Sequence, residues 1–147
     1  NYGEERRARA VAREIVRVRQ TQAITRTGQL ADVVRRVVRK SVDGLDPATR
    51  TFQAIRIAVN DEIGEVEKLL ATAPLMLAPG GRMTVISFHS LEDRVVKHSF
   101  RQWNTQGVLE VLTRRVVGPS TEEIADNPAS RSAKLRAAER TELEWPQ

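Results

Sequence analysis

The chain has 147 residues, of which 40% are hydrophobic and 29% charged, a composition typical of a folded domain and unlike that of a disordered or collagen-like chain. It contains no cysteine, which excludes disulfide scaffolds, cysteine-ligated metal centres and cysteine nucleophiles. Its apolar stretches fall far short of the ~20 residues of a membrane span, and the charged N-terminus lacks the apolar segment of a signal peptide. We therefore expect a soluble, cytoplasmic domain, or a piece of a larger one, with no membrane partner.

Positive charge is concentrated in the first part of the chain. Residues 1–40 contain eleven basic and four acidic side chains, a net charge of +7, whereas the remaining 107 residues contain 13 basic and 15 acidic side chains. Arginine accounts for most of the excess, and its planar guanidinium suits phosphate groups. The pattern predicts that the N-terminal third faces a polyanion such as a nucleic acid, with a solvated helix surface as the alternative.

The first eighty residues are expected to be almost wholly helical. Residues 4–20 place apolar side chains at helical spacing with arginines between them, which indicates a basic amphipathic helix. Thr27 is the expected N-cap of a second helix, which ends at residues 39–40. A third, longer helix is expected to start at Asp46-Pro47 and to keep one apolar face until Pro74.

The pattern changes after a Gly-Gly turn, and an α/β sheet is expected from there on. The run Met83–Phe88 is nearly continuous in apolar residues and rich in β-branched ones, which predicts a buried parallel strand. Ser90 is the expected cap of a helix that runs to about Trp103. Two more strands are expected over residues 108–117 and 133–141. In the second, the expected inward side chains are Ala133, Leu135 and Ala137, and the expected outward ones are Lys134 and Arg136.

Chemistry is expected where the first strand ends, because ligands of open α/β sheets bind beyond the carboxyl ends of the strands. Ser87, Phe88, His89 and Ser90 occupy that position. A histidine there can orient a base or shuttle a proton, and serines beside it can hydrogen-bond an exocyclic group. The alternative is that His89 only satisfies loop carbonyls and Ser90 only caps the next helix.

Other motifs are read as structural. His98 lies in the middle of the predicted helix without a second histidine or a clustered carboxylate, so we interpret it as a surface residue and expect no metal site. Gly80-Gly81 follows a helix and precedes a strand, which is the reverse of the order in a dinucleotide-binding loop, so it is interpreted as a turn.

Four segments then carry a resemblance to a known family. They are DPATRTFQAIRIAVNDE (46–62), PGGR (79–82), ISFHSLEDRVVK (86–97) and NPASRSAKLR (127–136). In this order they resemble the bacterial MraW/RsmH family, whose members are S-adenosylmethionine-dependent methyltransferases that act on N4 of a cytosine in small-subunit (16S) ribosomal RNA. The opening residues 2–6 are similar to the family's entry into its inserted helical domain, so the resemblance covers essentially the whole chain.

The resemblance implies an α/β fold: the C-terminal part of a class I (Rossmann-like) methyltransferase sheet with an inserted helical subdomain. Residues 1–45 would be most of the basic, RNA-facing helical insertion, and residues 46–147 the C-terminal part of the methyltransferase domain. The strand at 83–88 would be a central strand, and the last two strands the terminal antiparallel pair. The implied partner is 16S-type ribosomal RNA or the small ribosomal subunit.

The resemblance also implies that several family features lie upstream of residue 1. They are the glycine-rich cofactor loop, the acidic residue that holds the cofactor ribose, and a catalytic-loop segment. We therefore expect no cofactor-binding residues in this chain and no activity unless a separate chain supplies the cofactor-binding half, with a homodimer through exposed sheet edges as an alternative arrangement. Asp46 stands where the family usually has histidine.

The implied reaction requires an unstacked cytosine placed in line with the methyl sulfonium. The residues expected on the substrate side are Ser87, Phe88, His89, Ser90, Arg131 and Ser132, with His89 and Ser87 as catalytic candidates. The arginines expected on the RNA backbone are Arg6, Arg9, Arg13, Arg17, Arg35, Arg36, Arg50 and Arg56. Phe88 could stack on the base or lie in the core, and Arg50 and Arg56 could instead pack against the sheet. The alternative function is a non-catalytic module that binds ribosomal RNA or assists small-subunit assembly.

Overall fold

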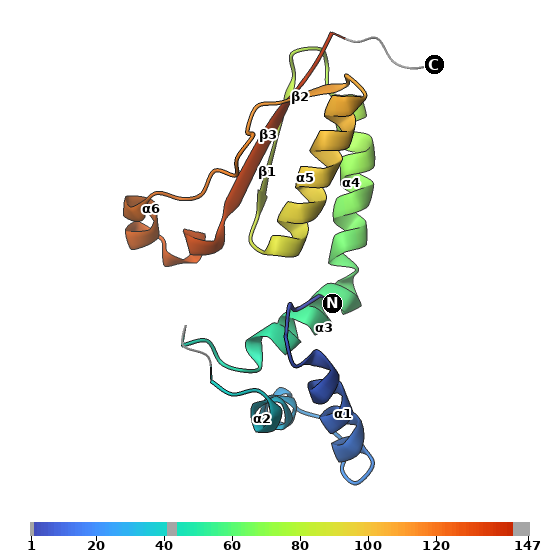
Figure 1. Cartoon of the computed structure of the whole chain (residues 1–147), viewed down its shortest axis with the longest axis vertical. Helices are drawn as coiled ribbons and strands as arrows, with labels where there is room; N and C mark the ends of the chain where they lie inside the picture. The colour runs from blue at the N-terminus through green and yellow to red at the C-terminus, as the bar shows by residue number, and fades with distance from the viewer. Residues whose placement is uncertain (1, 41–43, 143–147) are drawn as a thin grey trace. The chain divides into compact units, whose positions relative to one another are not determined.

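The computed structural model describes residues 2–40 and 44–142 and has a mixed α/β architecture (Figure 1). The chain divides into two compact units, Asn1–Glu62 and Ile63–Gln147. The described part of the first unit is helical, and the second combines helices with a three-stranded sheet. The mixed α/β class expected from the sequence is confirmed. The division after residue 45 differs from these units, and the assignment of residues 46–62 to a methyltransferase domain stays a prediction.

Three helices form most of the first unit. They are α1 (Ala8–Arg19), α2 (Thr27–Val37) and α3 (Thr49–Asn60). The apolar stripes predicted from the helical spacing meet in a small core, which contains Val11 of α1, Val34 of α2 and Ala48 before α3. Burial of these stripes leaves the arginines between them at the surface.

The first two helices differ from the sequence prediction at their N-termini: α1 begins later, and α2 has a different cap. α1 begins at Ala8 because Glu4 has a left-handed backbone (φ 48°) and the Glu5 carboxylate accepts a hydrogen bond from the Arg7 amide at 2.7 Å. Thr27 is the first residue of α2 and not its cap. The Gln29 side chain instead accepts from the amides of residues 25 and 26, at 2.9 and 3.0 Å.

The long third helix expected from the sequence is two helices. Asp61 has a left-handed backbone (φ 50°, ψ 38°) and separates α3 from α4 (Glu62–Met76). α3 starts at Thr49, and Asp46 precedes it as a turn residue whose carboxylate accepts from the Ala48 amide at 2.8 Å. α4 passes through Pro74 and ends at Met76.

The second unit holds an antiparallel sheet with the strand order β1-β3-β2. β1 (Arg82–Ser87) and β2 (Leu109–Val111) both pair antiparallel with the central β3 (Lys134–Arg140). The antiparallel pairing expected for the last two strands is therefore confirmed. The strand expected over 108–117 is shorter than predicted, with only an isolated bridge from Val117 to Leu135 beyond β2.

β1 is not the buried parallel strand that its apolar run predicted. Its described neighbour, β3, runs antiparallel to it, and its side chains alternate between half-buried and exposed along most of its length. Ile86, for example, is 55% exposed. Met83 and Val85 pack on the core from the other face.

The core of the second unit lies between the sheet and its helices. α5 (Ser90–Thr105) directs Val96 and Phe100 into it, where they meet Leu70 of α4 and Ala138 of β3. The Trp103 indole N–H donates to the Leu70 carbonyl at 2.9 Å, which ties α5 to α4. These contacts hold α5 against α4 and the sheet.

The inward face of β3 is the opposite of the predicted one. Arg136, Ala138 and Arg140 are buried, and Leu135 and Ala137 are only half-buried. Both arginines are inward because they have partners there. The Arg136 guanidinium binds Asp93 of α5, and Arg140 Nη1 donates to the Val108 carbonyl at 3.1 Å. Because side chains alternate between the two faces of a strand, an error of one residue in the prediction exchanges every side chain between those faces.

Two short helices connect β2 with β3. α6 (Thr121–Asp126) is capped by the Ser120 hydroxyl, which accepts from the Glu123 amide at 3.0 Å, and the 3-10 helix η1 (Pro128–Ser132) leads into β3. None of the helices described in residues 2–40 and 44–142 is long and apolar enough to cross a membrane.

Candidate functional site

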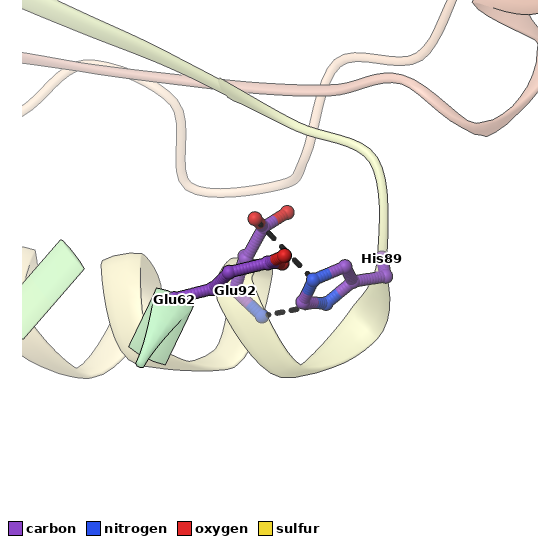
Figure 2. A group of neighbouring side chains, drawn as sticks. All are labelled: Glu62, His89 and Glu92. Carbon is purple, nitrogen blue, oxygen red and sulfur yellow. Dashed lines mark hydrogen bonds and ion pairs between the residues drawn. The ribbon is translucent and has the colours of Figure 1, made fainter. Parts of the chain in front are cut away.

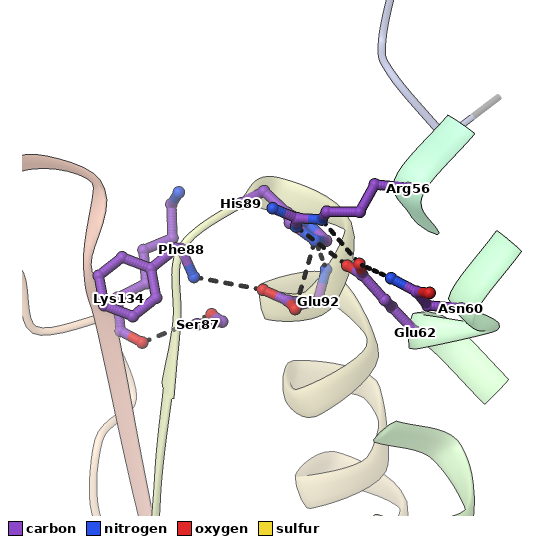
Figure 3. Close-up of polar contacts among 8 residues, drawn as sticks. All are labelled: Arg56, Asn60, Glu62, Ser87, Phe88, His89, Glu92 and Lys134. Atoms are coloured by element: carbon purple, nitrogen blue, oxygen red, sulfur yellow. Dashed lines mark hydrogen bonds and ion pairs between the residues drawn. The ribbon is translucent and has the colours of Figure 1, made fainter. Parts of the chain in front are cut away.

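The end of β1 and the end of η1 lie at the same end of the sheet. Ser87, the last residue of β1, pairs with Lys134, the first residue of β3, and its hydroxyl lies 3.5 Å from the Lys134 carbonyl (Figure 3). Ser132 ends η1 only two residues before Lys134. The fold thus brings the two groups of predicted substrate-side residues to one end of the sheet.

Phe88 is exposed just beyond the strand. Its side chain is 55% exposed, so the expectation that it could lie in the core is wrong. Its backbone amide donates to Glu92 Oε2 at 3.3 Å, which anchors the residue (Figure 3). An exposed ring on an anchored backbone is suited to stacking against a flat ligand.

His89 is the N-cap of α5. Its Nδ1 accepts a hydrogen bond from the Glu92 amide at 3.2 Å, and its Nε2 lies 3.3 Å from Glu92 Oε1 (Figure 2). This arrangement requires the ring proton on Nε2, because Nδ1 acts as the acceptor. Ser90 is the first helical residue and not the cap, which corrects the sequence interpretation.

Glu92 is the residue that sequence reasoning did not assign to the site. Its backbone amide and its carboxylate both contact His89, and the carboxylate also accepts from the Phe88 amide. The available signal was an acidic residue three positions after the cap, which is the spacing of a capping box. Glu92 therefore fixes both the histidine ring and the backbone that presents Phe88.

Arg131 and Ser132 lie in η1 and are both exposed. The turn beneath them is fixed by Ser130, which is buried and donates its hydroxyl to the Asn127 carbonyl at 2.8 Å. Arg131 is thus held on a short rigid turn at the end of the sheet where β1 ends. His98 of α5 is exposed, as expected for a surface residue.

In the first unit, the predicted RNA-backbone arginines fall into two groups. Arg6, Arg9 and Arg13 are exposed along one side of α1 and the turn before it, and within the described residues none has a carboxylate within 4.0 Å. Arg36 on α2 and Arg50 on α3 are exposed as well. Arg6, Arg9 and Arg13 therefore present their cationic groups to solvent.

The second group is engaged with carboxylates. Arg17 pairs with Glu14 at 2.6 Å, and Arg35 pairs with Asp32 at 2.9 Å and with Asp46 at 2.6 Å. In a separate pair, Arg56 Nε lies 2.7 Å from Glu62 Oε1 (Figure 3).

Two of these pairs change the acidity of the carboxylates. Hydrogen bonding from Arg17 holds the pKa of Glu14 below its ordinary value, and hydrogen bonding from Arg35, followed by the Ala48 amide, does the same for the pKa of Asp46.

The Gly80-Gly81 turn is not a cofactor loop. The Gly80 amide donates to the Arg140 carbonyl and the Gly81 amide to the Ala78 carbonyl, each at 2.8 Å. A phosphate-binding glycine loop would direct such amides toward the ligand. The turn therefore does not fit a nucleotide cofactor, and the interpretation of Gly80-Gly81 as a turn is confirmed.

Comparison with known proteins gives a consistent result. Residues 1–141 match the model of the MraW methylase family. The chain is 53% identical to a Ribosomal RNA small subunit methyltransferase H from Rhodospirillum centenum, in an alignment that covers 95% of this chain and 47% of that protein. It is 50% identical to the proteins of the same name from Paramagnetospirillum magneticum (95% and 49% covered) and Rhodopirellula baltica (96% and 43% covered). The chain spans about half the length of these curated relatives, and it belongs to the MraW methylase family.

Proposed function

We propose that this chain is the substrate-side portion of a methyltransferase that transfers a methyl group from S-adenosylmethionine to N4 of a cytosine in small-subunit ribosomal RNA. The observation that carries the proposal is the identity of 50–53% over 95% of the chain with relatives named Ribosomal RNA small subunit methyltransferase H. In this proposal the order β1-β3-β2 is the C-terminal end of a class I methyltransferase sheet, and the protein acts in the cytoplasm.

The end of β1 would present the target base. Bound S-adenosylmethionine supplies an electrophilic methyl group, and the protein must hold an unstacked cytosine against it. Phe88 supplies an exposed ring for stacking, and the Glu92 carboxylate holds the backbone amide of that residue. Arg131 and Ser132, exposed at the same end of the sheet, would contact the flanking phosphates.

His89 acts in this proposal as a positioning residue. Its Nδ1 caps α5 and its Nε2 lies 3.3 Å from Glu92 Oε1, so Glu92 holds the ring at the start of the helix. Ser87 is buried with its hydroxyl near the Lys134 carbonyl, and we assign it the same kind of role. The substrate amino proton would then leave to a group outside the described residues.

The basic helices would dock the ribosomal RNA. Arg6, Arg9 and Arg13 lie on one exposed side without carboxylate partners in the described part of the chain, as phosphate-binding residues must. Arg17 and Arg35 are neutralised by their partners and contribute less in this proposal. Arg36 and Arg50 would extend the docking surface.

A separate chain that carries the cofactor-binding half would complete the site. The described residues contain a glycine turn that does not fit the cofactor, and the curated relatives are about twice as long as this chain. The second candidate function, which the exposed arginines of α1 favour, is a non-catalytic module that binds ribosomal RNA or assists small-subunit assembly. Methyl transfer by the completed pair separates the two candidates. A homodimer is the alternative way of completing the site.

The RNA-docking part of the proposal is tested by titrating the chain with a small-subunit rRNA fragment over a range of salt concentrations. We expect the logarithm of the affinity to fall with the logarithm of the salt concentration, and Arg9→Gln with Arg13→Gln to reduce that slope by about 0.7–0.9 per lost phosphate contact. Arg17→Gln on the same helix is the matched control, because Arg17 already pairs with Glu14. Salt-independent binding, or equal effects of the control and the test variants, would contradict the proposal.

A further inference from the structure

The second unit has a cationic groove that neither the sequence interpretation nor the family match assigns. The groove encloses about 480 Å³ and is lined by residues of α5, of β2 and the segment after it, and of β3. It is not part of the end of the sheet where Phe88 and His89 lie, because none of the residues at that end lines it. Its charged side chains are Lys97, Arg101, Glu110, Arg114 and Arg136.

Three of the cations are not neutralised by the protein. Within the described residues, Lys97, Arg101 and Arg114 have no carboxylate within 4.0 Å. Lys97 and Arg101 are four residues apart on α5 and so occupy neighbouring positions on one side of the helix. Among the residues that the structure describes, Glu110 is the single carboxylate that lines the groove, so a net positive charge remains.

The walls of the groove are fixed by hydrogen bonds. The Arg136 guanidinium is held by Asp93 through its Nε and Nη2, at 2.7 and 3.1 Å, so that pair is neutral. The Thr113 hydroxyl accepts from the Ala137 amide at 2.9 Å, and the Asn104 side chain accepts from the Val111 amide at 3.2 Å. These bonds join α5 and the β2 segment to their neighbours, so a ligand meets a preformed surface.

We propose that this groove binds the phosphodiester backbone of a single RNA strand. The inference rests on the proposed function, and it adds a second RNA contact in the unit that carries Phe88. Cations carried by two separate elements suit successive phosphates of a strand better than one compact anion. Hydroxyl and amide groups between them can hydrogen-bond phosphate and sugar oxygens.

The test is RNA binding by the chain and by groove variants, measured by fluorescence anisotropy at several salt concentrations. Lys97→Gln, Arg101→Gln and Arg114→Gln, combined, should lower the slope of log affinity against log salt by about 2, at about 0.7 per single-strand phosphate contact. Arg115→Gln is the matched control, because Arg115 is exposed next to Arg114 but does not line the groove. A triple variant with the wild-type slope, or a control with the same effect as Arg114→Gln, would overturn the inference.

Protection of lysine side chains from chemical acylation, measured on the wild-type chain, gives a second readout that does not depend on the folding of a variant. Lys97 should be protected from amine acylation when RNA is bound, whereas Lys68, which pairs with Glu65, should react equally with and without RNA. Inorganic phosphate should compete only through its ionic strength, and stronger competition would identify a compact-anion site and overturn the inference. If the groove variants lower the salt slope but Arg9→Gln with Arg13→Gln does not, only the proposal that α1 docks the RNA is contradicted. The two proposals can therefore fail separately.

Discussion

Asp93 in the first turn of α5 holds Arg136 in β3 through two hydrogen bonds, Nε to Oδ1 at 2.7 Å and Nη2 to Oδ2 at 3.1 Å. The two side chains are only 17% and 10% exposed, respectively. The pair ties the helix that follows the candidate site to the central strand of the sheet, and it accounts for an arginine on the buried face of β3.

Breaking this pair should destabilise the second unit strongly. Asp93→Asn leaves a nearly buried guanidinium without its counter-charge, and we expect a loss of about 3 kcal/mol in the free energy of unfolding, measured with urea. The control is Glu139→Gln, which breaks the ion pair with Arg82, whose side chain is 72% exposed, and should cost under about 1 kcal/mol. Equal effects of the two variants would contradict the structural role of the pair.

The contribution of His89 to stability as the N-cap of α5 should be separable from any other role of its imidazole ring. His89→Ala removes the acceptor for the Glu92 amide and should cost about 1 kcal/mol of unfolding free energy, whereas His89→Asp keeps an N-cap acceptor and should recover most of it. Urea unfolding measures both. If Asp restores stability but not RNA binding or turnover in a completed enzyme, the ring has a role beyond the cap; an unchanged stability of His89→Ala would show that the cap is absent.

Gly3 should not tolerate a side chain. A Cβ at this position would collide with the Arg50 carbonyl of α3. We expect Gly3→Ala to lower the free energy of unfolding of the first unit by about 1–3 kcal/mol, the usual range for overpacking. Gly28→Ala is the control, because its Cβ would meet nothing within 4 Å and alanine favours the helix, so that variant should be neutral or stabilising. A Gly3→Ala variant as stable as wild type would contradict the close approach.

Asp46 should contribute to acid sensitivity. The Arg35 hydrogen bond lowers the pKa of Asp46 in the folded chain, so its contribution to stability is present above the unfolded pKa of about 4 and is lost as the pH falls through the folded value. Comparison of urea midpoints at about pH 6 and about pH 3 should show a smaller drop for Asp46→Asn than for wild type. Glu67→Gln on the exposed side of α4 is the control, and a drop in Asp46→Asn equal to that of wild type would contradict the prediction.

Local periodicity predicted the helices of this chain well because their apolar stripes pack as the spacing requires. Val11 and Val34 meet in the first core, and Val96 and Phe100 meet in the second. The break at Asp61 was not predictable from that spacing, since the apolar face continues across it and only the left-handed backbone interrupts the helix.

Side-chain partners from distant segments explain what the sequence interpretation missed. The inward face of β3 depends on Asp93, 43 positions away, so polarity alone assigned Arg136 to the wrong side. The candidate site residues were predicted from their position directly after β1. The cap role of His89 was not predictable in this way, because it depends on which side chain accepts the hydrogen bond from the Glu92 amide. Ser90, the usual residue type for a cap, is displaced by its neighbour.

The central claim is that this chain supplies the substrate side of a ribosomal RNA methyltransferase. Its most direct test is mass spectrometry of small-subunit rRNA after incubation with S-adenosylmethionine, the chain, and a polypeptide that covers the part of the Rhodospirillum centenum relative beyond the region aligned with this chain. We predict that N4-methylcytidine forms only when both polypeptides are present and that Phe88→Ala in this chain reduces it. An associated pair that yields no N4-methylcytidine, or equal product from the second polypeptide alone, would contradict the claim.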